Sequence, residues 1–171
     1  MKNNLLKLTM LSMFVAIGVV ISPLLRVEGF APTAHLVNVV VAVLMGPWYA
    51  LVNGIITAII RMTVMGIPPL AITGQVFGAV LAGILYRASK GKLIFASIGE
   101  VIGTGIIGAI VSYPVMRFIV GRGDLALFFY VPSFTIASLI GAGVAFIMLK
   151  TMQKTGVLTP VQLKLGGKLY E

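Results

Sequence analysis

The sequence predicts an all-α membrane protein, a single bundle of six transmembrane helices. Of its 171 residues, 59% are hydrophobic and only 10% are charged, and the mean hydropathy is +1.10. A soluble domain carries about 25% charged residues. The apolar residues also gather into six runs, and most basic residues stand at the ends of these runs. A water-soluble fold could not bury this much apolar surface, so we expect lipid to cover part of it.

The six expected segments lie between charged or Pro/Gly-rich breaks. Their approximate bounds are 5–22, 34–45, 47–64, 71–88, 93–113 and 125–149. Pro23 ends the first, Pro47 is well suited to start the third, and Pro114 ends the fifth. A span needs ~20 apolar residues, so the second segment should be a partial span buried by its neighbours. We expect residues 1–150 to form one domain and residues 151–171 a polar cytoplasmic tail.

The first segment has the basic start and apolar core of a signal peptide. No small-x-small cleavage site follows it, and the stretch from Pro23 to Arg26 is typical of a loop. We therefore expect a retained helix.

The positions of Lys and Arg predict the orientation in the membrane. The side that carries both termini holds nine: Lys2, Lys7, Arg87, Lys90, Lys92, Lys150, Lys154, Lys164 and Lys168. The other side holds four: Arg26, Arg61, Arg117 and Arg122. The positive-inside rule therefore places both termini in the cytoplasm. We therefore expect the basic residues behind the net charge of +9 to set the orientation and to contact anionic lipid, rather than to bind nucleic acid. We expect Arg61 to extend along its helix to the interface.

Small residues recur at four-residue spacing, which predicts close helix packing in lipid. The sets are Ser12/Ala16, Gly74/Gly78/Ala82, Gly99/Gly103, Gly105/Ala109 and Ala137/Gly141/Ala145.

Several kinds of chemistry find no support. There is no cysteine, hence no disulfide and no thiolate metal site, and a single histidine with four acidic residues leaves little for catalysis. The 103–108 stretch matches a dinucleotide-binding glycine pattern, but it lies inside an apolar helix without a preceding strand. No P-loop for ATP exists. We expect no metal, no cofactor and no enzymatic activity.

Polar side chains within apolar segments are the candidate substrate-binding residues, because such groups are costly in lipid. Glu100 is the only acid inside a span and lies one turn from Thr104, although a purely structural carboxylate is the alternative. His35 and Asn38 share a helix face, either for a polar ring ligand or as contacts between helices. The full candidate set is His35, Asn38, Gln75, Glu100, Thr104, Tyr113, Tyr130 and Ser133. We expect all but Glu100 and Thr104 in the outer half, where they could form a small pocket that opens outward.

Three stretches resemble the ThiW family. They are His35-Leu-Val-Asn38 with 44–49 (LMGPWY), 83–87 (GILYR), and 99–109 (GEVIGTGIIGA) with 112–114 (SYP). The small size, basic N-terminus and Ser12-Met-Phe-Val-Ala16 resemble, more broadly, the substrate-binding S components of energy-coupling-factor (ECF) transporters. Ser12 stands where those proteins usually have alanine.

The resemblance implies a membrane receptor that binds the thiamine precursor hydroxyethylthiazole on the outer side. It also implies docking, through Ser12 and Ala16, on a transmembrane coupling protein that carries two ATPase subunits. One alternative is an S component for another vitamin or precursor, such as a pyrimidine, riboflavin or biotin. Another is a membrane-embedded enzyme using Glu100 and His35, which we expect to lie far apart in depth. A stand-alone channel or carrier is a third, although no inverted repeat is visible.

Overall fold

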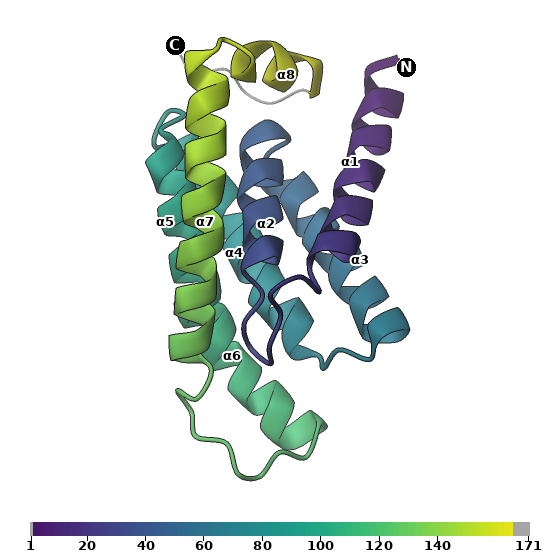
Figure 1. Ribbon diagram of the computed structural model, residues 1–171, viewed down its shortest axis with the longest axis vertical. Coiled ribbons are helices and arrows are strands. Elements are labelled where there is room, and N and C mark those ends of the chain that lie inside the picture. Colours follow the sequence, from purple (N-terminus) through teal and green to yellow (C-terminus); the bar gives the residue numbers. More distant parts are fainter. Residues whose placement is uncertain (1, 166–171) are drawn as a thin grey trace.

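The computed structural model describes residues 2–165, and these residues form helices and loops without a β-strand. The elements are α1 (Lys2–Ile21), α2 (Pro32–Leu44), α3 (Pro47–Met65), α4 (Leu70–Ala88), α5 (Leu93–Ile102), the π-helical η1 (Gly103–Gly108), α6 (Ala109–Pro114), the π-helical η2 (Val115–Ile119), α7 (Val131–Lys154) and α8 (Leu158–Leu165). The all-helical prediction is confirmed. In Figure 1, α1 starts and α7 ends at the same end of the bundle.

Five helical stretches are long and apolar enough to cross a membrane. They are Asn4–Ile21, Pro47–Met65, Leu70–Ala88, Leu93–Ile119 and Val131–Lys154. The remaining apolar helix, α2, has only 13 residues and stands in the middle of the bundle, where most of its residues are buried (Figure 1). A short second segment covered by its neighbours was the prediction, and it is confirmed.

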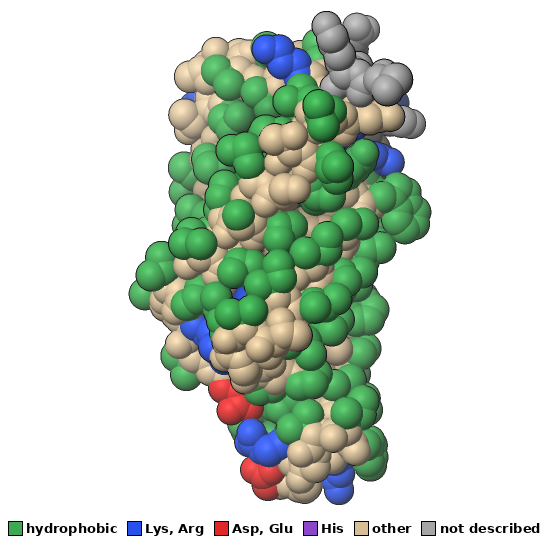
Figure 2. Space-filling model, turned by 90° about the vertical axis from the view of Figure 1, so that its right-hand side faces the viewer, with side chains coloured by type: hydrophobic (Ala, Val, Ile, Leu, Met, Phe, Trp, Pro, Cys, Tyr) green, Lys and Arg blue, Asp and Glu red, His purple; other side chains and the backbone are tan. Residues whose placement is uncertain are grey.

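Hydrophobic side chains dominate the middle of the molecular surface. Figure 2 shows them along the length of one face, with most charged side chains towards its two ends. This distribution suits a protein whose middle is surrounded by lipid.

Two predicted boundaries were wrong. The fifth segment does not stop at Pro114, because the helix continues through the π-helical η2 to Ile119. A π-turn shifts the hydrogen-bonding register by one residue, which accommodates a proline that has no N–H to donate. The last span begins at Val131 rather than near residue 125, so that Pro132 falls in its first turn, where a missing N–H costs nothing.

The helices pack closely at the small residues of the fourth to sixth predicted segments, as predicted for those segments. A Cβ atom on Gly99 would lie 2.6 Å from the carbonyl oxygen of Leu81, and one on Gly103 would lie 2.6 Å from that of Phe77. The backbones of α4 and α5 therefore touch directly along this face. Gly141 on α7 likewise lies against the start of α2.

The segment expected to be a polar tail contains α8, which folds back onto the bundle. Leu158 and Leu165 are buried, and Gln162 Nε2 donates to the carbonyl of Val43 and to the hydroxyl of Tyr86, at 2.9 and 3.0 Å. Residues 166–171, including Lys168 of the charge count, lie outside the described residues.

Candidate functional site

A buried polar network joins α2, α4, α5 and η1 around the carboxylate of Glu100, whose exposed fraction is 0%. Its Oε1 lies 2.9 Å from His35 Nδ1, 3.1 Å from Asn38 Nδ2 and 3.0 Å from Thr104 Oγ1. A carboxylate oxygen only accepts, so these three side chains act as donors. Four of the predicted site residues thus meet at one oxygen atom.

The expectation that His35 and Glu100 lie far apart in depth is wrong. Helix α2 begins only at Pro32, after the loop of residues 22–31, and it is too short to span the bundle. His35 in its first turn therefore lies at the depth that Glu100 reaches on α5. Counting residues along the chain places a helix end at the surface by default, and a helix that begins inside the bundle violates that assumption.

The backbone of α4 completes the network. Asn38 Nδ2 also donates to the carbonyl of Gln75 at 3.2 Å. The single hydroxyl proton of Thr104 is shared between Glu100 and the carbonyl of Gly74, which lies 2.9 Å from Oγ1. The other carboxylate oxygen, Oε2 of Glu100, has no hydrogen-bond partner among the described residues. It lies against Gly78, where a Cβ atom would come within 2.7 Å of it. The glycine thus leaves room for the carboxylate.

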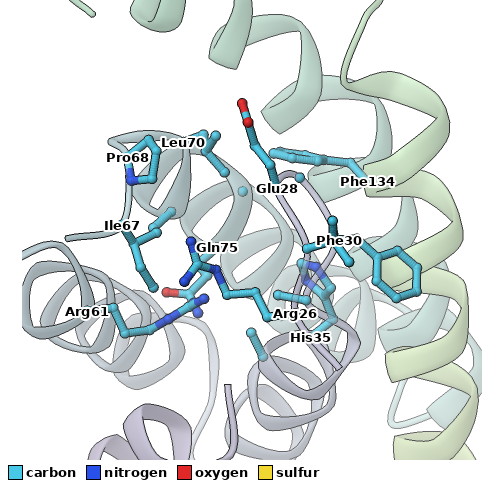
Figure 3. Close-up of a pocket in the computed structure, with 16 residues that line it drawn as sticks. Arg26, Glu28, Phe30, His35, Arg61, Ile67, Pro68, Leu70, Gln75 and Phe134 are labelled. Carbon is cyan, nitrogen blue, oxygen red and sulfur yellow. The ribbon is translucent and has the colours of Figure 1, made fainter. Parts of the chain in front are cut away.

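A pocket opens beside this network, towards the end of the bundle opposite the end of α7. Its enclosed cavity volume is about 40 Å³, and the empty space grows to about 440 Å³ when the part that is open to solvent is included. The loop after α1 and the ends of α2, α3, α4 and α7 enclose it (Figure 3). Its polar lining residues are Arg26, Glu28, His35, Arg61 and Gln75. Its larger apolar ones are Phe30, Ile67, Leu70 and Phe134. A mostly apolar cavity with a few convergent polar groups is typical of a small-molecule site.

We predicted that Arg61 extends along its helix to the membrane interface, and this prediction is wrong. Its side chain is only 3% exposed and lines the pocket, because the end of α3 is covered by the turn at Ile67 and by α4. With the amide of Gln75 oriented to satisfy its neighbours, its oxygen accepts from Arg61 Nη1 at 3.1 Å and its nitrogen donates to the carbonyl of Gly54 at 3.1 Å. Gln75 thereby holds the guanidinium at the pocket.

Tyr130 and Ser133 lie behind the pocket rather than in its lining. Tyr130 is 1% exposed, and its hydroxyl donates to Glu28 Oε1 at 3.1 Å. Burial, and then this bond, raise the pKa of the Tyr130 phenol to about 12, so the hydroxyl remains a donor. Ser133 Oγ donates to the carbonyl of Tyr130 at 3.1 Å and faces Gly29, whose φ is +74°. Both residues support the loop that covers the pocket.

Tyr113 is further away from the network. Its hydroxyl accepts from Arg117 Nη1 at 2.7 Å, and its ring packs near the loop before α7. The structure therefore brings His35, Asn38, Gln75, Glu100 and Thr104 together and places the three remaining candidates elsewhere.

Sequence reasoning missed Arg26, Glu28, Arg61 and Phe134 as pocket residues. The position of the two arginines, Arg26 and Arg61, relative to the predicted membrane could have identified them. Both belong to the minority of basic residues on the side opposite the termini, where the positive-inside rule gives no reason for them.

The predicted docking residues lie on the outward face of α1. Ser12 and Ala16 are exposed, whereas Leu11 and Val15, about 100° around the helix, are buried against the bundle. The small pair is thus not used for packing within this chain.

Comparison with known proteins gives a family match for this chain. The family model described as "Thiamine-precursor transporter protein (ThiW)" matches residues 8–155, which include the whole network and pocket. No curated protein and no solved structure shows a significant match to the chain. Since the matched region covers most of the 171 residues, the chain belongs to the ThiW family of thiamine-precursor transporters.

Proposed function

We propose that this protein is the substrate-binding S component of an ECF-type importer and that it binds the thiamine precursor hydroxyethylthiazole from the outer side. The observation that carries the proposal is the pocket itself, which has His35 and Gln75 in its lining and the Glu100 network behind it. Membership of a transporter family supports a role in uptake.

His35 is the residue we assign to recognition of the ligand. Its Nδ1 is occupied by Glu100, so its other ring nitrogen, Nε2, remains for a molecule in the pocket. The hydrogen bond at one imidazole nitrogen sets the role of the other. Glu100 therefore acts by orienting the imidazole, and Asn38 acts by holding the Glu100 carboxylate. Phe134 and Ile67 supply apolar walls for a flat ring.

Uptake through such a receptor requires partners. The chain has no P-loop, so energy would come from a transmembrane coupling protein with two ATPase subunits. We assign docking to the exposed Ser12 and Ala16, because small side chains allow another helix to approach closely.

The orientation belongs to the same proposal, with both termini in the cytoplasm and the pocket facing outward. Because the chain has no cysteine, single cysteines can be introduced as reporters at Lys90 and Arg122. An impermeant thiol reagent should label Arg122→Cys in intact cells and Lys90→Cys only after permeabilisation. Equal labelling of both in intact cells would contradict this topology.

Binding by the purified protein tests the substrate. Titration calorimetry should detect hydroxyethylthiazole and rank it above hydroxymethylpyrimidine, riboflavin and biotin. A buried hydrogen-bond partner is worth about 1–3 kcal/mol, so His35→Ala should weaken binding roughly tenfold to a hundredfold. Asn53→Ala is the control, since Asn53 is 1% exposed but does not line the pocket. Tighter binding of another vitamin would favour a different S component.

The contact between His35 and Glu100 also fits an acid–base pair, which keeps a membrane-embedded enzyme as a second candidate. A receptor should return its ligand chemically unchanged after long incubation. Mass spectrometry of the recovered ligand separates the two functions, since a product that disappears in Glu100→Gln would favour the enzyme.

A further inference from the structure

Two arginines converge on the pocket from different elements. Figure 3 shows the side chains of Arg26, from the loop after α1, and Arg61, from α3, reaching towards the same region beside Gln75. Arg61 is 3% exposed, and its buried Nε has no hydrogen-bond partner among the described residues. The side chain of Arg26 forms no hydrogen bond or ion pair within the described range. Guanidinium groups remain charged in proteins, so two positive charges face this space.

No acidic residue of the described chain neutralises them. Glu28 lines the same pocket, but its Oε1 accepts from Arg122 and Tyr130, both at 3.1 Å. Figure 3 shows its carboxylate pointing away from the two arginines. Among the described residues, the only ion-pair contact of Glu100 is with His35. Asp124 pairs with Arg122 in an exposed loop. A buried guanidinium without a counter-charge is costly, and an anion in the pocket would relieve that cost.

We infer that the ligand carries an oxyanion, a carboxylate or phosphate group, which binds between Arg61 and Arg26. The inference rests on the proposed function and deepens it: among thiazoles, those whose side arm ends in such a group should bind more tightly than neutral hydroxyethylthiazole. A guanidinium can donate two parallel N–H bonds to an oxyanion, and Arg61 has its Nε available for this. The ring of the ligand then lies towards His35 and Phe134. The same charges oppose the cationic ring of thiamine itself.

Three matched ligands test the inference on the full-length protein in phosphatidylcholine nanodiscs. They are neutral hydroxyethylthiazole, its phosphate ester, and 4-methylthiazole-5-acetic acid. At least one anionic ligand should bind tenfold or more tightly than the neutral one, and added salt should reduce this preference. Equal or tighter binding of the neutral ligand would overturn the inference and leave the proposed function intact. Failure of all three thiazoles to bind would overturn both.

Variants then locate the anion. Arg61→Gln and Arg26→Gln should each reduce the preference for the anionic ligand by tenfold or more, while affinity for the neutral ligand changes by less than about threefold. Arg117→Gln is the control, because Arg117 bonds to Tyr113 outside the pocket and its loss should leave the preference unchanged. Arg26 lies in an exposed loop, so its variant should fold even if that of Arg61 does not. A preference that survives both substitutions would overturn the inference.

A lipid headgroup could supply the same oxyanion. Nanodiscs that contain phosphatidylglycerol distinguish the two sources. If the ligand supplies the anion, the affinity for the ligand should be the same in both lipids apart from a general effect of the membrane surface charge. That general effect should be equally large in the Arg26→Gln variant. If native mass spectrometry instead shows phosphatidylglycerol retained by the wild type and lost in Arg26→Gln, the group is a lipid phosphate and the assignment to the ligand is overturned.

Discussion

Replacement of Glu100 by glutamine should measure what the buried network contributes to stability. Three donors meet Glu100 Oε1 at 2.9–3.1 Å, from His35, Asn38 and Thr104. Hydrogen bonds to a charged group contribute about 1.5–3 kcal/mol each, roughly twice the neutral value. Glutamine keeps one carbonyl acceptor, so each bond should lose about half. The expected loss is about 2–4 kcal/mol, or roughly 5–15 °C in Tm for a chain of this size.

The assay is the fraction of protein that stays monodisperse after heating in detergent, measured by size exclusion. Glu28→Gln is the matched control. Glu28 is 44% exposed in its side chain and pairs with Arg122 near the surface, where such a pair contributes at most about 1 kcal/mol. The amide oxygen of glutamine can still accept from the Tyr130 hydroxyl. The Tm of this variant should therefore fall by only a few degrees.

A double-mutant cycle isolates the contact between His35 and Glu100. Stability is compared in His35→Ala, Glu100→Gln and the double variant, under conditions where unfolding is reversible. Groups in direct contact should show a coupling free energy of about 0.5–3 kcal/mol, so the double variant should lose less than the sum of the single ones. Additive effects within about 0.3–0.5 kcal/mol would show that the 2.9 Å contact contributes nothing and would refute the reasoning.

Two further predictions concern helix contacts. Ala16→Trp should abolish transport by blocking approach of the coupling protein but leave ligand binding by the isolated protein intact, whereas Ile17→Trp, about 100° around the same exposed helix, should transport normally. Transport by Ala16→Trp at the wild-type rate would exclude this face. Gly99→Ala should lower the stability by about 1–3 kcal/mol, because its Cβ would lie 2.6 Å from the Leu81 carbonyl oxygen; Gly143→Ala, with nothing within 4 Å, should raise it by up to about 1 kcal/mol. Similar melting temperatures for these two variants would contradict the close approach of α4 and α5.

Most of the helical architecture could be predicted along the chain. Pro47 after Gly46 starts α3, and Gly66, with φ of +62°, follows its last residue, as backbone rules require. The spacing of Gly99 and Gly103 predicted a close helix contact, because only a missing side chain permits it. The wrong helix boundaries were those at Pro114 and at the start of α7. The π-helical η2 continues the helix beyond Pro114, and the residues before Val131 form a loop.

The sequence by itself determined that the chain is a helical membrane protein, and it identified the few intramembrane polar residues as candidates for the site. Both follow from the cost of apolar surface in water and of polar groups in lipid, which depends on composition and local order. Only the tertiary structure decided which polar residues meet. His35 and Glu100 are 65 positions apart, and Arg61 reaches Gln75 only because the end of α3 packs against α4. Such contacts depend on where helices begin in depth and how they pack, and no local pattern in the chain carries that information.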